Sequence, residues 1–222
     1  MIDALLRRPS GAGEFFADAV RLLCVFSLAA AVLWYGPVDV ALFLLVLMGI
    51  LISRCLDISR VFDVIYGLTL LAAAWSSVLN LYARVSWWDL PVHFAATGVI
   101  AAMTYLLLAR LGAVPAPAPS PAPSPAPSPA PSPVPGRSLA LRIAVPVLVL
   151  ALGLAVSVLW ELGEWWGNAF VDGSINVGYQ DTMGDLAAGG LGALLAGLAL
   201  GKASRPPHRR QEAGTEETFS RR

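Results

Sequence analysis

Three short segments of the chain each place two chemically active side chains one helical turn apart. Residues three or four positions apart lie on the same face of an α-helix, so each pair could contact one ligand. Carboxylates and an imidazole can bind Mg²⁺, Mn²⁺, Zn²⁺ or Fe, and carboxylates also serve as general bases. If the three segments meet in space, they predict a metal-binding or acid–base site. The pairs are Asp89 with His93, Glu161 with Glu164, and Asp181 with Asp185.

Apolar helices are the elements that must position these pairs. The chain is 57% hydrophobic and only 14% charged, whereas a soluble domain is about 25% charged. A helix needs about 20 apolar residues to cross a bilayer. The composition therefore predicts an all-α, polytopic membrane protein. Its expected partner is the lipid bilayer, and we expect no binding of nucleic acid and assign no protein partner. We predict membrane-spanning helices over residues 16–35, 38–53, 61–83, 91–111, 139–165 and 182–201.

The basic residues predict that both ends of the chain lie in the cytoplasm, where Lys and Arg are favoured. With six spanning helices, this orientation puts fourteen of the fifteen Lys and Arg residues inside and only Arg84 outside. The fourth, fifth and sixth helices then bring their polar pairs to the same outer side. A count of about 20 residues back from Lys202 leaves Asp185 about one turn inside the outer boundary.

The segments outside the helices complete the domain organisation. We predict a cytoplasmic N-terminus over residues 1–15, a disordered cytoplasmic linker over 112–138 and a disordered cytoplasmic tail over 202–222. The first four helices occupy 16–111, and the last two occupy 139–201. The linker repeats Pro with Ala or Ser, and Pro removes a backbone donor and fixes φ, so we expect a polyproline II spacer. The alternative is a Pro-rich docking site for a partner.

The outer end carries more acidic than basic groups. Its five carboxylates have one imidazole and one arginine, Arg84, to offset them. Like charges in a partly dry site cannot all stay ionised without compensation by protons, by Arg84 or by a bound cation. We hypothesise one divalent metal ion, with Glu164 or Asp181 as the general base that activates water, and with Arg84 as a substrate contact. The hypothesised metal ligands are Asp89, His93, Glu161 and Asp185.

Each of these residues also has a structural interpretation. Asp181 suits the N-cap of the sixth helix, where Asp is favoured. His93 could be a hydrogen-bonded core histidine, and Glu164 could be solvated at the membrane interface. Asp185 and Glu161 are harder to explain in this way because they lie deeper.

A row of small residues continues the face of Asp181 and Asp185 along the sixth helix. Small residues spaced by four let another helix approach closely. We predict that this row packs against a neighbour and so turns both aspartates into the bundle. The row comprises Gly189, Ala193, Gly197 and Gly201.

Taken together, the three polar motifs resemble those of the YjdF-like bacterial inner-membrane proteins. The matching residues are DLPVHF at 89–94 with Gly98, ELGEW at 161–165, and GYQDTMGD at 178–185 ahead of glycines 189–192. The pattern is more distantly similar to that of VanZ-like membrane proteins. It covers roughly 84–197, apart from the Pro-rich linker. The resemblance implies a multi-pass protein of the bacterial cytoplasmic membrane whose biochemical activity is unsettled.

Three functions remain open from the sequence. The first is a membrane-embedded, metal-dependent hydrolase or phosphotransferase acting on a lipid or lipid-linked head group. Two features count against it: no Ser or Cys nucleophile stands beside a base, and no cluster of Lys or Arg is placed to bind phosphate. The second is a proton- or cation-coupled transporter, which the lack of an internal repeat and of a mid-membrane carboxylate disfavours. The third is a structural protein whose polar cluster only locks the helix bundle.

Overall fold

The chain is α-helical throughout the residues that the structure describes. The computed structural model describes residues 11–56, 58–115, 137–173, 175 and 177–203, and within these ranges it contains no strand. Six of its helices are long and apolar enough to cross a membrane, which confirms the predicted all-α, polytopic architecture. The elements are α2 (Ala12–Trp34), α3 (Pro37–Cys55), α4 (Arg60–Val78), α5 (Leu81–Arg84), α6 (Asp89–Arg110), α7 (Arg137–Phe170) and α8 (Tyr179–Ala203).

Two predicted helix ends differ from the structure by five residues: α7 continues to Phe170 instead of ending at 165, and the third predicted helix ends early. The predicted helix 61–83 is wrong beyond Val78, because α4 ends there and the short helix α5 follows separately. Asn80, between them, has φ 56° and ψ 37°, a left-handed conformation that Asn tolerates but that a continuous α-helix cannot include. The predictions for residues 1–10, 116–136 and 204–222 lie outside the described residues.

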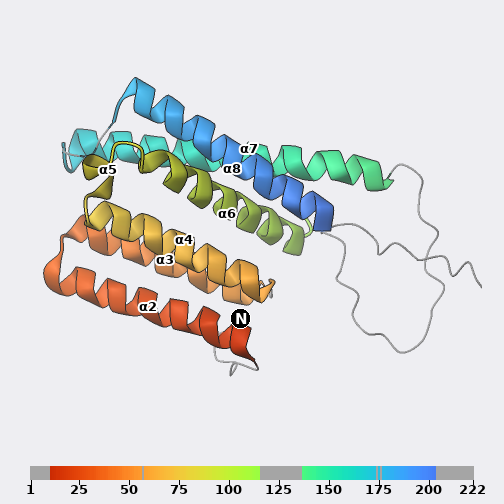
Figure 1. Cartoon of the computed structure of the whole chain (residues 1–222), viewed down its shortest axis with the longest axis horizontal. Helices are drawn as coiled ribbons and strands as arrows, with labels where there is room; N and C mark the ends of the chain where they lie inside the picture. The colour runs from red at the N-terminus through yellow and green to blue at the C-terminus, as the bar shows by residue number, and fades with distance from the viewer. Residues whose placement is uncertain (1–10, 57, 116–136, 174, 176, 204–222) are drawn as a thin grey trace, which may run out of the picture.

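The helices form two three-helix groups that join along one seam (Figure 1). Helices α2, α3 and α4 pack on one another, and α6, α7 and α8 do the same, while α4 and α6 connect the two groups. Phe43, Ile50 and Leu71 lie in the core of the first group, which Met103 of α6 also joins. All three polar pairs therefore belong to the second group.

Glycines set the close approach of α6, α7 and α8. A β-carbon on Gly98 would lie 2.9 Å from the carbonyl oxygen of Gly192, and one on Gly192 would overlap the carbonyl of Phe94. A β-carbon on Gly153 would overlap the methyl group of Ala193. Backbones this close need small residues on both sides. The predicted row of small residues on α8 is buried against α6 and α7 at all four positions, which confirms its packing role.

The helices alternate in direction, so their ends gather in two sets (Figure 1). One end of the molecule holds α5, the start of α6, the end of α7 and the start of α8. The opposite end holds the start of α2, the end of α3 and the start of α4. This arrangement brings the three polar pairs to one end, as the alternating topology predicts. Which end faces the cytoplasm stays a prediction.

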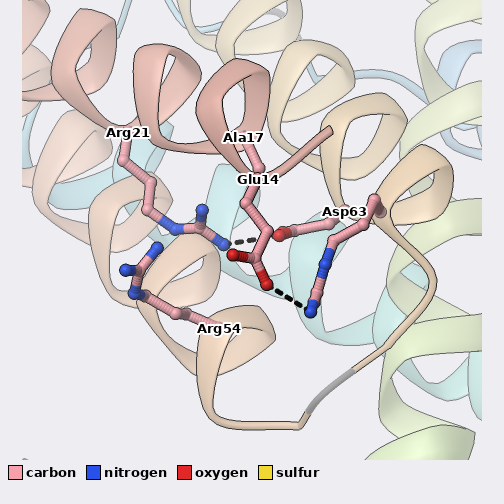
Figure 2. Close-up of a pocket in the computed structure, with 6 residues that line it drawn as sticks. Glu14, Ala17, Arg21, Arg54 and Asp63 are labelled. Carbon is pink, nitrogen blue, oxygen red and sulfur yellow. Dashed lines mark hydrogen bonds and ion pairs between the residues drawn. The ribbon is translucent and has the colours of Figure 1, made fainter. Parts of the chain in front are cut away.

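A set of ion pairs links α2, α3 and α4 at the end opposite the polar pairs; Figure 2 shows the pair between Arg21 and Asp63 and the ion pair of Glu14. Arg21 donates to Asp63 over 2.6 Å and to Asp18 over 2.9 Å. Arg54 also pairs with Asp18. The guanidinium of Arg60 lies 2.5 Å from Glu14. Each of these three acids therefore has an arginine partner. We call this set the paired-charge network; it comprises Glu14, Asp18, Arg21, Arg54, Arg60 and Asp63.

Candidate functional site

Three of the four hypothesised metal ligands meet in the structure. One ligand atom each from Asp89, His93 and Asp185 lies within 4.8 Å of the other two. Within this Asp-His-Asp triad, His93 Nε2 and Asp89 Oδ1 are 3.2 Å apart. Ligand atoms bound tetrahedrally at about 2.1 Å stand about 3.4 Å from one another. The 3.2 Å between His93 and Asp89 already matches that spacing, whereas atoms 4.8 Å apart would have to approach by about 1.4 Å to bind one ion.

The triad becomes more enclosed from Asp89 to Asp185. The side chain of Asp89 is 24% exposed and that of His93 is 11% exposed, whereas Asp185 is 2% exposed. Among the described residues, neither aspartate forms a salt bridge with Lys or Arg, and His93 is the one basic partner. The site thus has a buried acidic floor and an accessible rim on the side of Asp89.

Glu161, the fourth hypothesised ligand, lies beside the triad but is not one of its three members. It is 9% exposed, and its Oε2 accepts a hydrogen bond of 2.8 Å from the hydroxyl of Thr182 on α8. Its Oε1 is buried and has no hydrogen-bond partner among the described residues. The charge of Glu161 acts on Asp185. An unpaired buried carboxylate oxygen is costly, so this atom requires a partner.

Thr182 is a site residue that the sequence analysis missed. It lies in the first turn of α8, next to Asp181, and joins α8 to α7 through Glu161. Its position between two aspartates at the start of an apolar helix was the available signal. The signal is weak, because Thr near the start of a helix is also common for local reasons of backbone hydrogen bonding.

The two hypothesised general bases occupy the margin of the site. Glu164 is half-buried and accepts a hydrogen bond of 2.8 Å from the indole of Trp160. Its charge interacts with those of His93 and Asp89. Asp181 is also half-buried, and it lies close enough to Asp185 for the two carboxylates to repel each other. The N-cap interpretation of Asp181 is wrong, because α8 begins at Tyr179 and Asp181 lies inside its first turn.

Arg84 does not compensate the acidic groups in this structure. It lies at the end of α5 with an exposed side chain. Among the described residues it forms no salt bridge with the triad or with Glu161. Its hypothesised contact with a substrate stays a prediction.

Tyr82 of α5 is a second residue that the sequence analysis missed. Its hydroxyl donates a hydrogen bond of 3.0 Å to the carbonyl oxygen of Ala73 in α4. Burial raises the pKa of the Tyr82 phenol, and the charges of Asp89, Glu164 and Asp185 raise it further. Tyr82 therefore remains protonated and lies within electrostatic reach of the site. A lone tyrosine in a short interhelical segment gave no signal in the sequence.

The inner side of the site is closed. One turn below the triad, the hydroxyls of Thr97 and Ser157 lie 3.2 Å apart and are buried. A β-carbon on Gly189 would lie 2.8 Å or less from both hydroxyl oxygens. The next layer is apolar, and its backbones and methyl groups are in contact. The residues of this apolar layer are Ala101, Gly153 and Ala193.

The fold and this polar cluster define a polytopic α-helical membrane protein with a candidate metal site at one end. A family model described as "Predicted membrane protein (DUF2238)" matches residues 18–205, and the chain belongs to this family. The YjdF-like proteins are this family, so that resemblance is confirmed. The more distant similarity to VanZ-like proteins stays a prediction. No curated protein and no solved structure matches the chain.

Proposed function

We propose that this membrane protein binds one divalent metal ion through Asp89, His93 and Asp185, with Glu161 as the fourth ligand. The observation that carries the proposal is the convergence of α6 and α8 on three ligand atoms within 4.8 Å of one another, beside a buried carboxylate oxygen of α7 that lacks a partner. An ion there offsets the negative charge and satisfies Glu161. Three carboxylates and one imidazole favour Zn²⁺, Mn²⁺ or Fe over Mg²⁺, which prefers oxygen ligands.

The proposed reaction is hydrolysis or phosphoryl transfer on a lipid or lipid-linked head group. An ion held by Asp89, His93, Asp185 and Glu161 would supply an acidified water molecule at this position. Glu164 or Asp181, at the margin of the site, would take the proton from that water as its oxygen attacks the phosphorus, and the oxygen on the far side of the broken P–O bond would leave with a proton from solvent. Arg84 supplies a positive charge for the head group. The position of the site at the end of three apolar helices suits a bond that lies near the membrane surface.

Two observations favour this proposal over its alternatives. The close-packed layer of Ala101, Gly153 and Ala193 below the site disfavours a transport path for protons or cations. The excess of carboxylates over basic groups, together with the buried, unpartnered Oε1 of Glu161, disfavours a purely structural cluster. The distribution of basic residues further supports a bacterial cytoplasmic membrane location with the site facing outward.

Vesicles that contain the full chain test the reaction. They carry a phospholipid and a lipid-linked pyrophosphate, are supplied with Mn²⁺ or Zn²⁺, and are assayed for release of a water-soluble phosphorylated product. We expect a chelator to abolish the release. Glu164→Gln or Asp181→Asn should lower the rate of release by a factor of about 10² or more, while each variant still binds the metal ion. The matched control is Asp172→Asn, at an exposed position near the same end. Release that is unchanged in both base variants, or no release at all, contradicts the reaction.

A further inference from the structure

A groove between α2 and α3 has the properties of a lipid-binding site. It lies at the end opposite the metal-site candidate and has a volume of about 360 Å³, within the range of small-ligand sites. Its walls are one stripe of each helix: residues 18, 21, 22 and 25 of α2, and 47, 51 and 54 of α3. These spacings of three and four keep each stripe on a single helical face.

The polarity of the groove changes along its length. On α3, Arg54 lies in the last turn, and Leu51 and Leu47 lie about one and two turns further in; on α2, Asp18 lies nearer the start of the helix than Leu22 and Val25. At 1.5 Å per residue, Leu47 is about 10 Å deeper than Arg54. This order matches that of a phospholipid, with the head group outside and the acyl chain inside. The apolar part of the lining comprises Leu22, Val25, Leu47 and Leu51.

The charged part of the groove favours an anion. Arg21, Arg54 and Asp18 line it, which gives two guanidinium groups and one carboxylate. Asp63, which also pairs with Arg21, lines a second, small cavity, and both Arg21 and Arg54 line the two cavities. The groove lining therefore has one more guanidinium than carboxylate, and guanidinium groups suit phosphate oxygens well.

Arg21 provides a second, independent indication. It is 8% exposed, and its Nε has no hydrogen-bond acceptor among the described residues. A buried N–H without an acceptor costs free energy. An additional oxygen acceptor, such as a phosphate oxygen, is what this side chain lacks.

We propose that the α2–α3 groove binds one anionic phospholipid, with its phosphate at Arg21 and Arg54 and an acyl chain along the apolar stripes. In the orientation that the basic residues predict, this lipid belongs to the cytoplasmic leaflet, where basic pockets between helices bind such head groups. The groove is separate from the metal-site candidate and does not depend on it.

Native mass spectrometry of the purified full chain tests this proposal. The protein is equilibrated with equal amounts of phosphatidylglycerol and phosphatidylcholine, and the lipid retained on the protein is measured. We expect one phosphatidylglycerol per chain. Its ratio to bound phosphatidylcholine should rise about fivefold for each arginine that contacts the phosphate. Inorganic phosphate and glycerophosphate should not displace it, because they lack the acyl chain. Equal retention of the two lipids overturns the proposal.

Two variants on α2 separate the groove from the general lipid surface. Val25→Trp fills the groove, whereas Val32→Trp adds the same bulk at an exposed position outside it. We expect Val25→Trp to abolish the preference for phosphatidylglycerol and Val32→Trp to keep it. Both valines are well exposed, so neither change should prevent folding. A preference that survives in Val25→Trp contradicts the assignment.

Discussion

The two ends of the molecule carry clusters of similar residue types in opposite electrostatic situations. In the paired-charge network, all three acids contact an arginine, at distances such as 2.6 Å between Arg21 and Asp63. At the other end, Asp185 is even more buried, and His93 is the one basic group in the triad. In the first cluster the acids and arginines balance in charge, although the Nε of Arg21 has no acceptor among the described residues. The second has an excess of negative charge and an unpartnered oxygen on Glu161.

This difference shows how a functional cluster can be distinguished from a structural one. Buried charges are tolerated when they are paired and hydrogen-bonded. In the network, Ser53 adds a further hydrogen bond of 2.6 Å to Asp63, so the acid is satisfied within the fold. The triad lacks that compensation, and an external cation is the economical way to supply it. The network should therefore respond to mutation through stability, and the triad through metal binding.

The largest expected effect concerns the network. Asp63→Asn leaves the buried guanidinium of Arg21 with Asp18 as its remaining acidic partner, and breaking a buried ion pair costs about 3–5 kcal/mol. The free energy of unfolding, measured by denaturant titration in detergent, should fall by that amount. The double variant Arg21→Met with Asp63→Leu should recover most of the loss. A cost below about 1 kcal/mol would show that the network is not a stabilising element.

The next effect concerns removal of the ion from the triad. A ligand present at 100 times its dissociation constant stabilises the folded state by about 2.7 kcal/mol. Chelation should therefore lower the thermal stability of the wild-type protein by a comparable amount, and added Mn²⁺ or Zn²⁺ should restore it. Asp185→Asn provides the control, because its unfolding should be indifferent to the chelator. If the chelator leaves the thermal unfolding of the wild type unchanged, the triad holds no ion and is a structural cluster like the paired-charge network.

A smaller effect of opposite sign is expected in the metal-free protein. Asp185 is a buried carboxylate in an acidic cluster, so Asp185→Asn removes an uncompensated charge and should stabilise the chelated protein by about 1–3 kcal/mol. The melting temperature of the two chelated proteins measures this difference. Destabilisation of the same size would mean that Asp185 is paired within the fold, as Asp63 is.

The smallest effect distinguishes the periphery of the network from its centre. The side chain of Arg60 is 37% exposed in its pair with Glu14, so solvent can replace its partner. Glu14→Gln should change the free energy of unfolding by less than about 1 kcal/mol. The same denaturant titration measures it. A loss as large as that of Asp63→Asn would show that the whole network acts as one unit.

The fold followed from hydropathy because the bilayer fixes the length of its helices. Six apolar blocks were enough to predict six spans. Where the prediction failed, after Val78, the cause is a local backbone conformation at Asn80. Hydropathy does not report such a conformation, because the residues on both sides remain apolar.

The site was predicted less completely than the fold. Spacing and alternating direction placed Asp89, His93 and Asp185 together, and the structure agrees. Depth along the fifth predicted helix assigned Glu161 as a metal ligand and Glu164 as a general base, and these roles stay predictions. The structure buries Glu161 and leaves Glu164 half-buried, because of the way α7 is rotated on its neighbours. Tyr82 reaches the site through tertiary packing alone.

Metal content is the most direct test of the account. The full chain is purified, supplied with Mn²⁺ or Zn²⁺, freed of unbound ions and submitted to elemental analysis, beside Asp185→Asn and the network variant Glu14→Gln. The account predicts one ion per chain in the wild type and in Glu14→Gln, and close to none in Asp185→Asn. A wild type that holds no ion, or an Asp185→Asn protein that holds as much as the wild type, would contradict it.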